Sequence, residues 1–137
     1  MKVICIEVAR NTLPSWHPKC VRNTNQEIPI NRAVLGQEYL VCGILMRNYG
    51  PDYLLQDLGK PDWPLLAPAQ FFKMSSPTQP EVWFAGHVAT PAGDTPAMGY
   101  LEWVSRPLHF EGLVENNFED IEIFEKRANE IRLATAG

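Results

Sequence analysis

The sequence predicts a small α+β fold: a curved antiparallel β-sheet, or an SH3-like and partly open barrel, with one helix at its C-terminal end. Two observations support this. Short runs rich in β-branched and aromatic residues alternate with Gly, Pro, Asn and Asp up to Arg106. From Phe118 onward the apolar residues recur every three or four positions, which is the period of a helix. The 137 residues suit a single domain, with a strand-rich body at about 1–106 and an acidic helical part at about 107–137.

The first half of the chain contains the clearest strand signals. Lys2–Val8 reads as a first strand, whereas residues 11–31 contain three prolines and are not expected to form a long helix. Glu38–Arg47 is the strongest strand in the sequence. The turn residues Asn-Tyr-Gly-Pro-Asp follow it, and Tyr53–Leu58 should return as its hairpin partner.

The stretch WPLLAPAQFF then predicts a corner of the sheet. Pro64 and Pro68 cannot donate backbone hydrogen bonds, so this piece is expected to be an edge, a bulge or a kinked crossing. The aromatic residues Trp63, Phe71 and Phe72 are expected to point inward and fill the core.

The second half of the body is expected to contain two more strands. Glu81–Val88 and Tyr100–Arg106 have strand-like patterns, and residues 89–99, rich in small residues and prolines, read as the loop between them.

The C-terminal part predicts a helix that begins after Asn117. An Asn at this position is a favourable N-cap, and Asp120 follows three residues later. Acidic residues fill the first turn and basic residues come late, as the helix dipole favours. The expected buried stripe consists of Phe118, Ile121, Phe124, Ala128 and Ile131.

Composition and charge limit the classes of function. The net charge is −4, and residues 107–137 contain seven acidic but only three basic residues. Such a surface repels nucleic acid and favours a basic protein partner. No apolar run resembles a secretory signal or a membrane span, and Cys5 and Cys42 lie in apolar runs that suit reduced, buried thiols. We therefore expect a cytoplasmic protein with no membrane partner.

The sequence contains no clear catalytic centre. His17 and Cys20 are the only close pair of metal-ligand types, and a structural zinc site needs four ligands. Asp52, Asp57 and Asp62 lie in or beside turns, where Asp is favoured for its backbone hydrogen bonds. Phosphate-binding loops are absent. We assign no catalytic residue, no metal and no cofactor.

One stretch resembles a known family. LGQEYLVCGILMRNYGPDYLLQDLGKPDWPLLAPAQFF combines a Gly-x-Glu-Tyr lead into a strand, a mid-strand Gly, a hairpin ending in Asp and a Trp-Pro corner, and a further Trp follows at position 83. This order resembles the immunity proteins of bacterial polymorphic toxins, which are delivered by contact-dependent or type VI secretion. The likeness covers residues 35–87. It implies a non-enzymatic inhibitor that binds its cognate toxin domain and occludes the active site.

The expected partner-binding residues combine this resemblance with the acidic C-terminal part. They are Glu111, Glu115, Glu119, Asp120 and Glu122, with Tyr49 and Asp52 at the hairpin tip as a second patch. Two alternatives remain open. One is a small enzyme that uses Cys20 or the three turn aspartates. The other is a peptide- or ligand-binding module with a groove formed by Trp63, Phe71 and Phe72.

Overall fold

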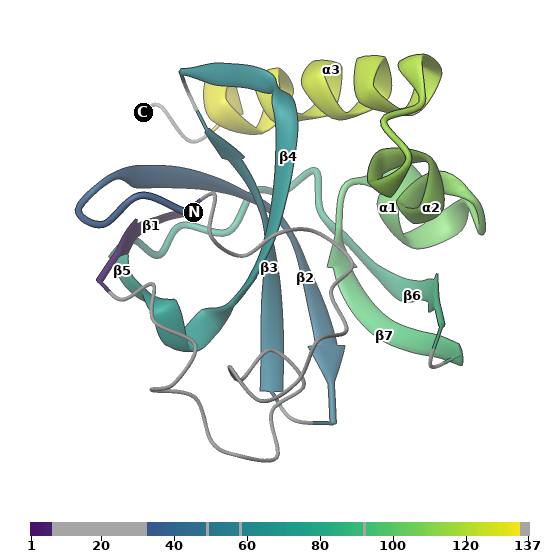
Figure 1. Ribbon diagram of the computed structural model, residues 1–137, viewed down its shortest axis with the longest axis horizontal. Coiled ribbons are helices and arrows are strands. Elements are labelled where there is room, and N and C mark those ends of the chain that lie inside the picture. The colour runs from purple at the N-terminus through teal and green to yellow at the C-terminus, as the bar shows by residue number, and fades with distance from the viewer. Residues whose placement is uncertain (7–32, 49, 58, 92, 135–137) are drawn as a thin grey trace.

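The computed structural model describes residues 1–6, 33–48, 50–57, 59–91 and 93–134. Its strands, labelled in Figure 1, are β1 (Lys2–Cys5), β2 (Glu38–Arg47), β3 (Gly50–Asp57), β4 (Lys60–Pro68), β5 (Phe72–Ser76), β6 (Phe84–Thr90) and β7 (Gly93–Gly99). Its helices are the single 3₁₀ turn η3 (Ala69–Phe71), then α1 (Leu101–Ser105), α2 (His109–Val114) and α3 (Phe118–Ala134).

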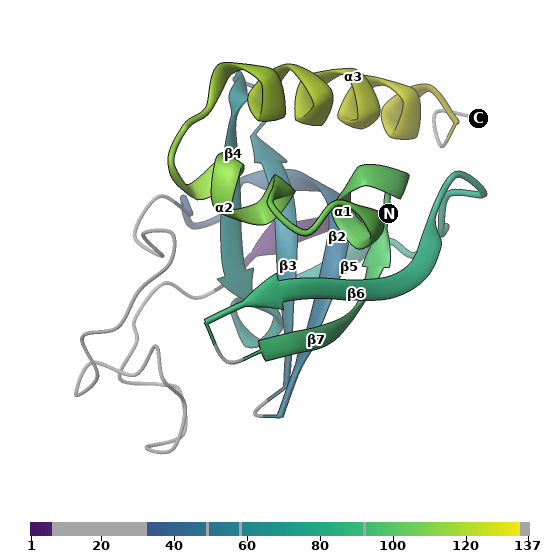
Figure 2. The same ribbon diagram turned by 90° about the vertical axis from the view of Figure 1, so that its right-hand side faces the viewer.

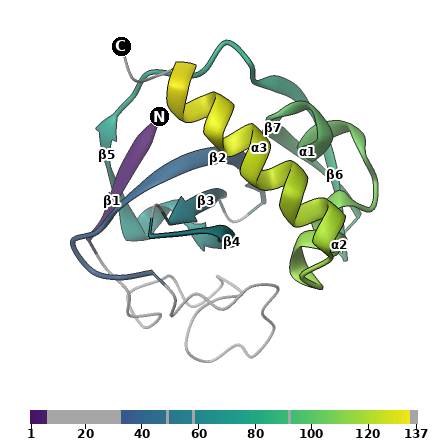
Figure 3. The same ribbon diagram turned by 90° about the horizontal axis from the view of Figure 1, so that it is seen from above.

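The described strands form one antiparallel sheet that is curved and open (Figure 1). Its main path runs β4-β3-β2-β1-β5, and β7 pairs with both β2 and β6. Helix α3 lies across one end of the sheet, where it packs against β4 and β2 (Figures 1 and 3). Helices α1 and α2 lie between α3 and the β6–β7 hairpin (Figure 2). The predicted α+β fold with a curved antiparallel sheet and a C-terminal helix is confirmed.

Strand β2 has the predicted bounds and organises the sheet. Its first half pairs with β1, and its second half pairs with β7, with a register shift against β3 between Val41 and Gly43. Gly43 pairs with Gly99 at the point where β7 joins. A Cβ atom on Gly43 would lie only 2.8 Å from Nε1 of Trp103, so the bare backbone makes room for this indole ring.

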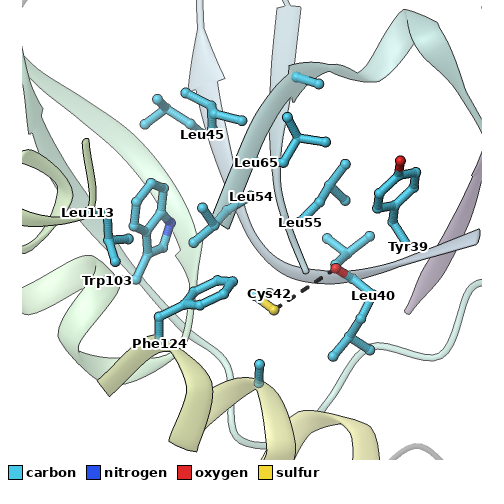
Figure 4. Packing of buried hydrophobic residues seen from close by; sticks show 14 of the residues in the cluster. Tyr39, Leu40, Cys42, Leu45, Leu54, Leu55, Leu65, Trp103, Leu113 and Phe124 are labelled. Atoms are coloured by element: carbon cyan, nitrogen blue, oxygen red, sulfur yellow. Dashed lines mark hydrogen bonds between the residues drawn. The ribbon is translucent and has the colours of Figure 1, made fainter. Parts of the chain in front are cut away.

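The core lies between the sheet and the three helices (Figure 4). β2, β3 and β4 contribute leucines, α1 contributes Trp103, and α3 contributes Phe124, all of them almost completely buried. Trp103 meets Phe110 of α2 edge to face, with ring centres 5.4 Å apart. The apolar stripe of α3 is buried at Ile121 and Ile131 as predicted, but Phe118 is 78% exposed because it is the first residue of the helix and lies outside the covered face.

The corner after β3 is confirmed in part. β4 is an edge strand, as its prolines predict, and its register with β3 shifts at Gln56 and Asp57. Phe71 and Phe72 are buried, but the inward position expected for Trp63 is wrong: this side chain is 43% exposed. Only the last five residues of β4 enter the core, and Trp63 precedes them.

Two further predictions are wrong. The loop expected at residues 89–99 is the end of β6 and all of β7, and the strand expected at Tyr100–Arg106 contains helix α1. Pro96 is tolerated in β7 because the pairing with β2 ends at Ala97, which leaves one side of the strand unpaired there. The chain becomes helical after Gly99, and this turn brings Trp103 over the Gly43–Gly99 pair.

The N-terminal predictions are tested only in part. β1 ends at Cys5, within the expected first strand, and residues 11–31 lie outside the described part of the chain. The strand expected at Glu81–Val88 begins later, at Phe84, and continues to Thr90.

Candidate interaction surface

Four of the five predicted acidic contact residues are exposed on two adjacent helices. Glu111 lies in α2, Glu115 follows it, and Glu119 and Glu122 lie in the first two turns of α3. The segment from 111 to 125 contains no Lys or Arg. The exposed carboxylates give this segment a net negative charge, which raises the rate of encounter with a basic partner.

Two asparagines set the angle between these helices. Asn116 has a left-handed backbone, with φ of 59°, and ends α2 in the way that a C-terminal Gly or Asn commonly does. The side-chain oxygen of Asn117 accepts a hydrogen bond from the backbone N–H of Glu119 at 3.0 Å, so the predicted N-cap is confirmed. The turn sets α2 in contact with α3, which lies above it (Figure 2).

Asp120, the fifth predicted contact, is half-buried and bonded within the protein. Its Oδ1 lies 2.7 Å from Nδ1 of His109, and Nε2 of the same ring lies 2.6 Å from the hydroxyl of Tyr100. Gly112 permits this arrangement, since a Cβ atom there would collide with the Asp120 carboxylate. Asp120 thus ties α3 to α2, and only part of its carboxylate is open to a partner.

Burial determines the ionisation of this network. It lowers the pKa of His109 below its ordinary value, and the hydrogen bond that the ring makes to the Asp120 carboxylate opposes that shift only in part. Burial also raises the pKa of Tyr100 well above its ordinary value. At neutral pH the ring is therefore uncharged, and the network is a chain of hydrogen bonds in the interior.

The second predicted patch does not lie on the surface as expected. Asp52 is completely buried, and its Oδ2 lies 3.0 Å from Nε of Arg47 on the paired strand. In this position it cannot touch a partner, so its role as a contact residue is corrected to a structural one. The reason is that β3 turns its carboxylate inward, where a buried charge needs an ion partner. Tyr49 lies outside the described residues.

An apolar groove runs beside the acidic surface, and the sequence did not predict it. It has a volume of about 450 Å³, within the size range of binding sites for small ligands or side chains. One wall is the end of β6 and the turn after it, residues 89–91. The other wall is α2 and its approach: Pro107, Leu108, Phe110, Glu111, Val114 and Glu115. Leu108 is 71% exposed, so most of this apolar side chain faces water at the groove.

A smaller groove of about 260 Å³ lies at Trp63. Lys60 places its Nζ 4.9 Å from the centre of the Trp63 ring. Phe71 and Phe72 do not line this groove and are buried elsewhere. The peptide groove expected from Trp63, Phe71 and Phe72 together is therefore not formed.

A third groove, of about 280 Å³, lies between the start of β6 and α3. Phe84 and Leu101 line it, and both are partly exposed. Its cation, Arg127, donates two hydrogen bonds of 2.8 Å to Glu102 and one of 2.9 Å to Glu130. The guanidinium lowers the pKa of Glu102 and joins α1 to α3.

Among the described residues weighed for catalysis, Asp57 lines the Trp63 groove but has the bonds of a turn residue. Asp57 accepts hydrogen bonds from the side chain of Gln37 at 2.7 Å and the backbone of Gly59 at 2.8 Å, as expected of a turn aspartate. Cys42 is buried, which raises the pKa of its thiol. Cys20 and His17 lie outside the described residues. In the part of the chain that is described, no group of three or more His, Cys, Asp or Glu side chains is arranged to hold a metal ion.

Comparison with known proteins adds no relative. No protein-family model matches the chain, and neither a curated protein nor a solved structure does. Of the described helices, none has the length and apolar character needed to cross a membrane. The functional argument therefore depends on the residues of this chain alone.

Sequence reasoning found the acidic surface but missed the groove and the Tyr100–His109–Asp120 network. The groove arises where residues 89–91 meet α2, and the sequence predicts a loop rather than a strand at residues 89–99. A weak signal was present in the stretch around Leu108, where Pro107, Leu108 and Phe110 form an apolar run directly before the first acidic residue. Neither spacing nor charge indicates that Tyr100 and Asp120 meet at one histidine.

Proposed function

We propose that this chain is an immunity protein, a non-catalytic inhibitor that binds a cognate bacterial toxin domain and occludes its active site. The observation that carries the proposal is the exposure of four carboxylates on α2, its end and the start of α3: Glu111, Glu115, Glu119 and Glu122. Toxins that cleave or modify nucleic acid need basic clefts for their substrates, and a rigid acidic surface is complementary to such a cleft. The resemblance of residues 35–87 to immunity proteins points the same way.

The arrangement favours binding over turnover. In the described part of the chain, two sets of buried titratable groups are engaged within the protein: His109 with Tyr100 and Asp120, and Asp52 with Arg47. The acidic residues that remain are on the surface, where they can meet a partner without a large desolvation cost. A fixed angle between α2 and α3 also reduces the entropy lost on binding.

The test is co-expression of this chain with the product of its neighbouring gene, assayed for complex formation and for inhibition of toxicity, with charge reversal on the proposed surface. We expect a stable complex whose association slows as salt is added, because rim charges act mainly on the on-rate. The double variant Glu111→Lys/Glu119→Lys should weaken the complex by about tenfold or more and lose protection of toxin-exposed cells.

A matched variant controls for net charge. Asp62→Lys/Glu81→Lys reverses two exposed acidic residues outside the α2–α3 surface and changes the net charge by the same amount. It should bind and protect like the parent chain. Equal loss of binding and protection in both variants would mean that overall charge, and not the α2–α3 surface, causes the effect. A chain that forms no complex with the neighbouring toxin and protects no cell would refute the proposed function.

A further inference from the structure

The groove between α2 and the β6–β7 turn combines two chemical features in one concavity. Its exposed apolar residues include Leu108, 71% exposed, and Val114, 40% exposed. Two carboxylates, Glu111 and Glu115, lie on the same wall. Burial of these apolar side chains by a partner would be favourable, because it removes apolar surface from water. Exposed apolar surface with polar residues around it is typical of interaction sites.

We propose that this groove receives one large apolar side chain of the partner, on a segment that carries lysine or arginine on both sides of that anchor. The apolar side chain would lie between Pro91 and Leu108, over Phe110, and the flanking cations would pair with Glu111 and Glu115. This inference deepens the function proposed above and rests on it, because it names the recognition mode at the same surface.

The charge of the lining residues specifies the occupant. No Lys or Arg is among the described residues that line the groove, although Arg106 directly precedes Pro107. An acidic or phosphorylated segment would meet two carboxylates of like charge, whereas a basic one would be attracted. An apolar anchor beside basic residues satisfies both features at once, and aromatic anchors commonly dominate such contacts.

The floor of the groove is preformed. Phe110 is 4% exposed and packs edge to face on Trp103, with ring centres 5.4 Å apart. His109, the adjacent residue, is held from both ring nitrogens, by Tyr100 at 2.6 Å and by Asp120 at 2.7 Å. α2 is therefore fixed from behind, and little ordering would be needed when a partner binds.

The other two grooves are less suited to a basic segment. At Trp63 the protein's own Lys60 already occupies the ring face, with Nζ 4.9 Å from its centre. At Arg127 the guanidinium lines the groove, and its hydrogen bonds occupy Glu102 and Glu130. Of these three grooves, as the described residues line them, the α2 groove alone combines exposed apolar residues with carboxylates that have no lysine or arginine beside them.

The experiment uses capped synthetic peptides and the full chain labelled with ¹⁵N. The probe has a central tryptophan–leucine pair with a pair of lysines on each side. One control replaces the lysines with glutamates, and another replaces the central pair with serines. We expect saturable amide shifts at Thr90, Leu108 and Val114 with the probe, and much weaker shifts with either control.

Two variants locate the site. Leu108→Ser should weaken binding of the probe by about tenfold, whereas Leu133→Ser, which changes a leucine 67% exposed on α3, should not. Glu115→Lys should weaken it by a few-fold, as expected for a rim charge, and Glu81→Lys should leave it unchanged. Retention of the ¹⁵N spectrum shows that each variant is folded.

Several results would contradict the proposal that the groove binds a basic segment with an apolar anchor. These are absence of any shift at the highest soluble concentration, shifts centred on Phe84 and Leu101, equal binding of the glutamate peptide, or full binding by Leu108→Ser. The outcome is separable from the proposed function. If the toxin complex tolerates Leu108→Ser, the chain is an immunity protein that does not use the groove. If the peptide binds but no toxin complex forms, the groove is a binding site and the immunity function is wrong.

Discussion

Asp52 shows how a single residue can have a role opposite to the one its type suggests. An aspartate beside a Gly-Pro turn is expected to face solvent, yet this one is completely buried and lies 3.0 Å from Nε of Arg47. The side chain of Arg47 is itself only 11% exposed. A buried pair of this kind contributes little net stability as a pair, but the removal of one partner takes the opposite charge away from the other in a buried place.

Asp52→Leu should therefore destabilise the fold by about 3 kcal/mol, measured by denaturant unfolding. The double variant Arg47→Met/Asp52→Leu removes both charges and should recover most of that loss. Asp62→Leu, at an exposed site in β4, should change the free energy of unfolding by less than about 0.5 kcal/mol. A double variant as unstable as Asp52→Leu alone would contradict the assignment of an ion pair.

Among the elements, α1 and α3 depend on one another through Arg127. Its guanidinium makes two hydrogen bonds with the Glu102 carboxylate, one from Nε and one from Nη2, each of 2.8 Å. The side chains of Arg127 and Glu102 are 28% and 12% exposed, so the pair is better shielded from water than a typical surface ion pair. Helix α1 has only five residues and cannot be stable without such contacts.

Arg127→Met should lower the free energy of unfolding by about 1–2 kcal/mol, since charge-assisted hydrogen bonds are lost while the apolar stem remains. Lys126→Met removes the same charge from an exposed neighbour on α3 and should be close to neutral. Thermal or urea unfolding at low and high salt would measure the change in the free energy of unfolding for both variants. Equal effects of the two substitutions would mean that the pair adds nothing beyond a surface charge.

The stability of the whole molecule should depend on pH through His109. Burial lowers its pKa, so the unfolded chain binds a proton at this residue before the folded chain does. The groups that face the ring are Tyr100, Asp120, Glu102 and Arg106, and the carboxylates offset only part of the shift. Stability should therefore fall as the pH drops below the ordinary histidine value of about 6.5.

Between pH 7 and 5.5 the free energy of unfolding should decrease with a slope of at most about 1.4 kcal/mol per pH unit. Glu102 does not contribute in this window, because its lowered pKa places its loss of stability at more acidic pH. His109→Gln should have a flatter profile, whatever its stability at pH 7. An unchanged slope in His109→Gln would assign the pH dependence to other groups.

Much of the fold was predictable because its signals are local. The bounds of β2 were predicted from one β-branched and apolar run, and the start of α3 from Asn117 and the period that follows. The predictions at residues 89–106 were wrong for a non-local reason. β7 is held by β2 and β6, and Trp103 fits over the Gly43–Gly99 pair, and neither contact is visible in the segment itself.

The features of the candidate surface are likewise of two kinds, those that the local sequence predicts and those that depend on tertiary contacts. The sequence by itself determined the acidic character of residues 107–137 and the helix that displays it, because charge and period belong to the local chain. Only the tertiary structure decided which of these carboxylates are available, where the apolar groove lies and which residues are hidden. Asp52 and Asp120 bond inside the protein and Trp63 stays outside it, because burial depends on what packs against each residue from distant parts of the chain.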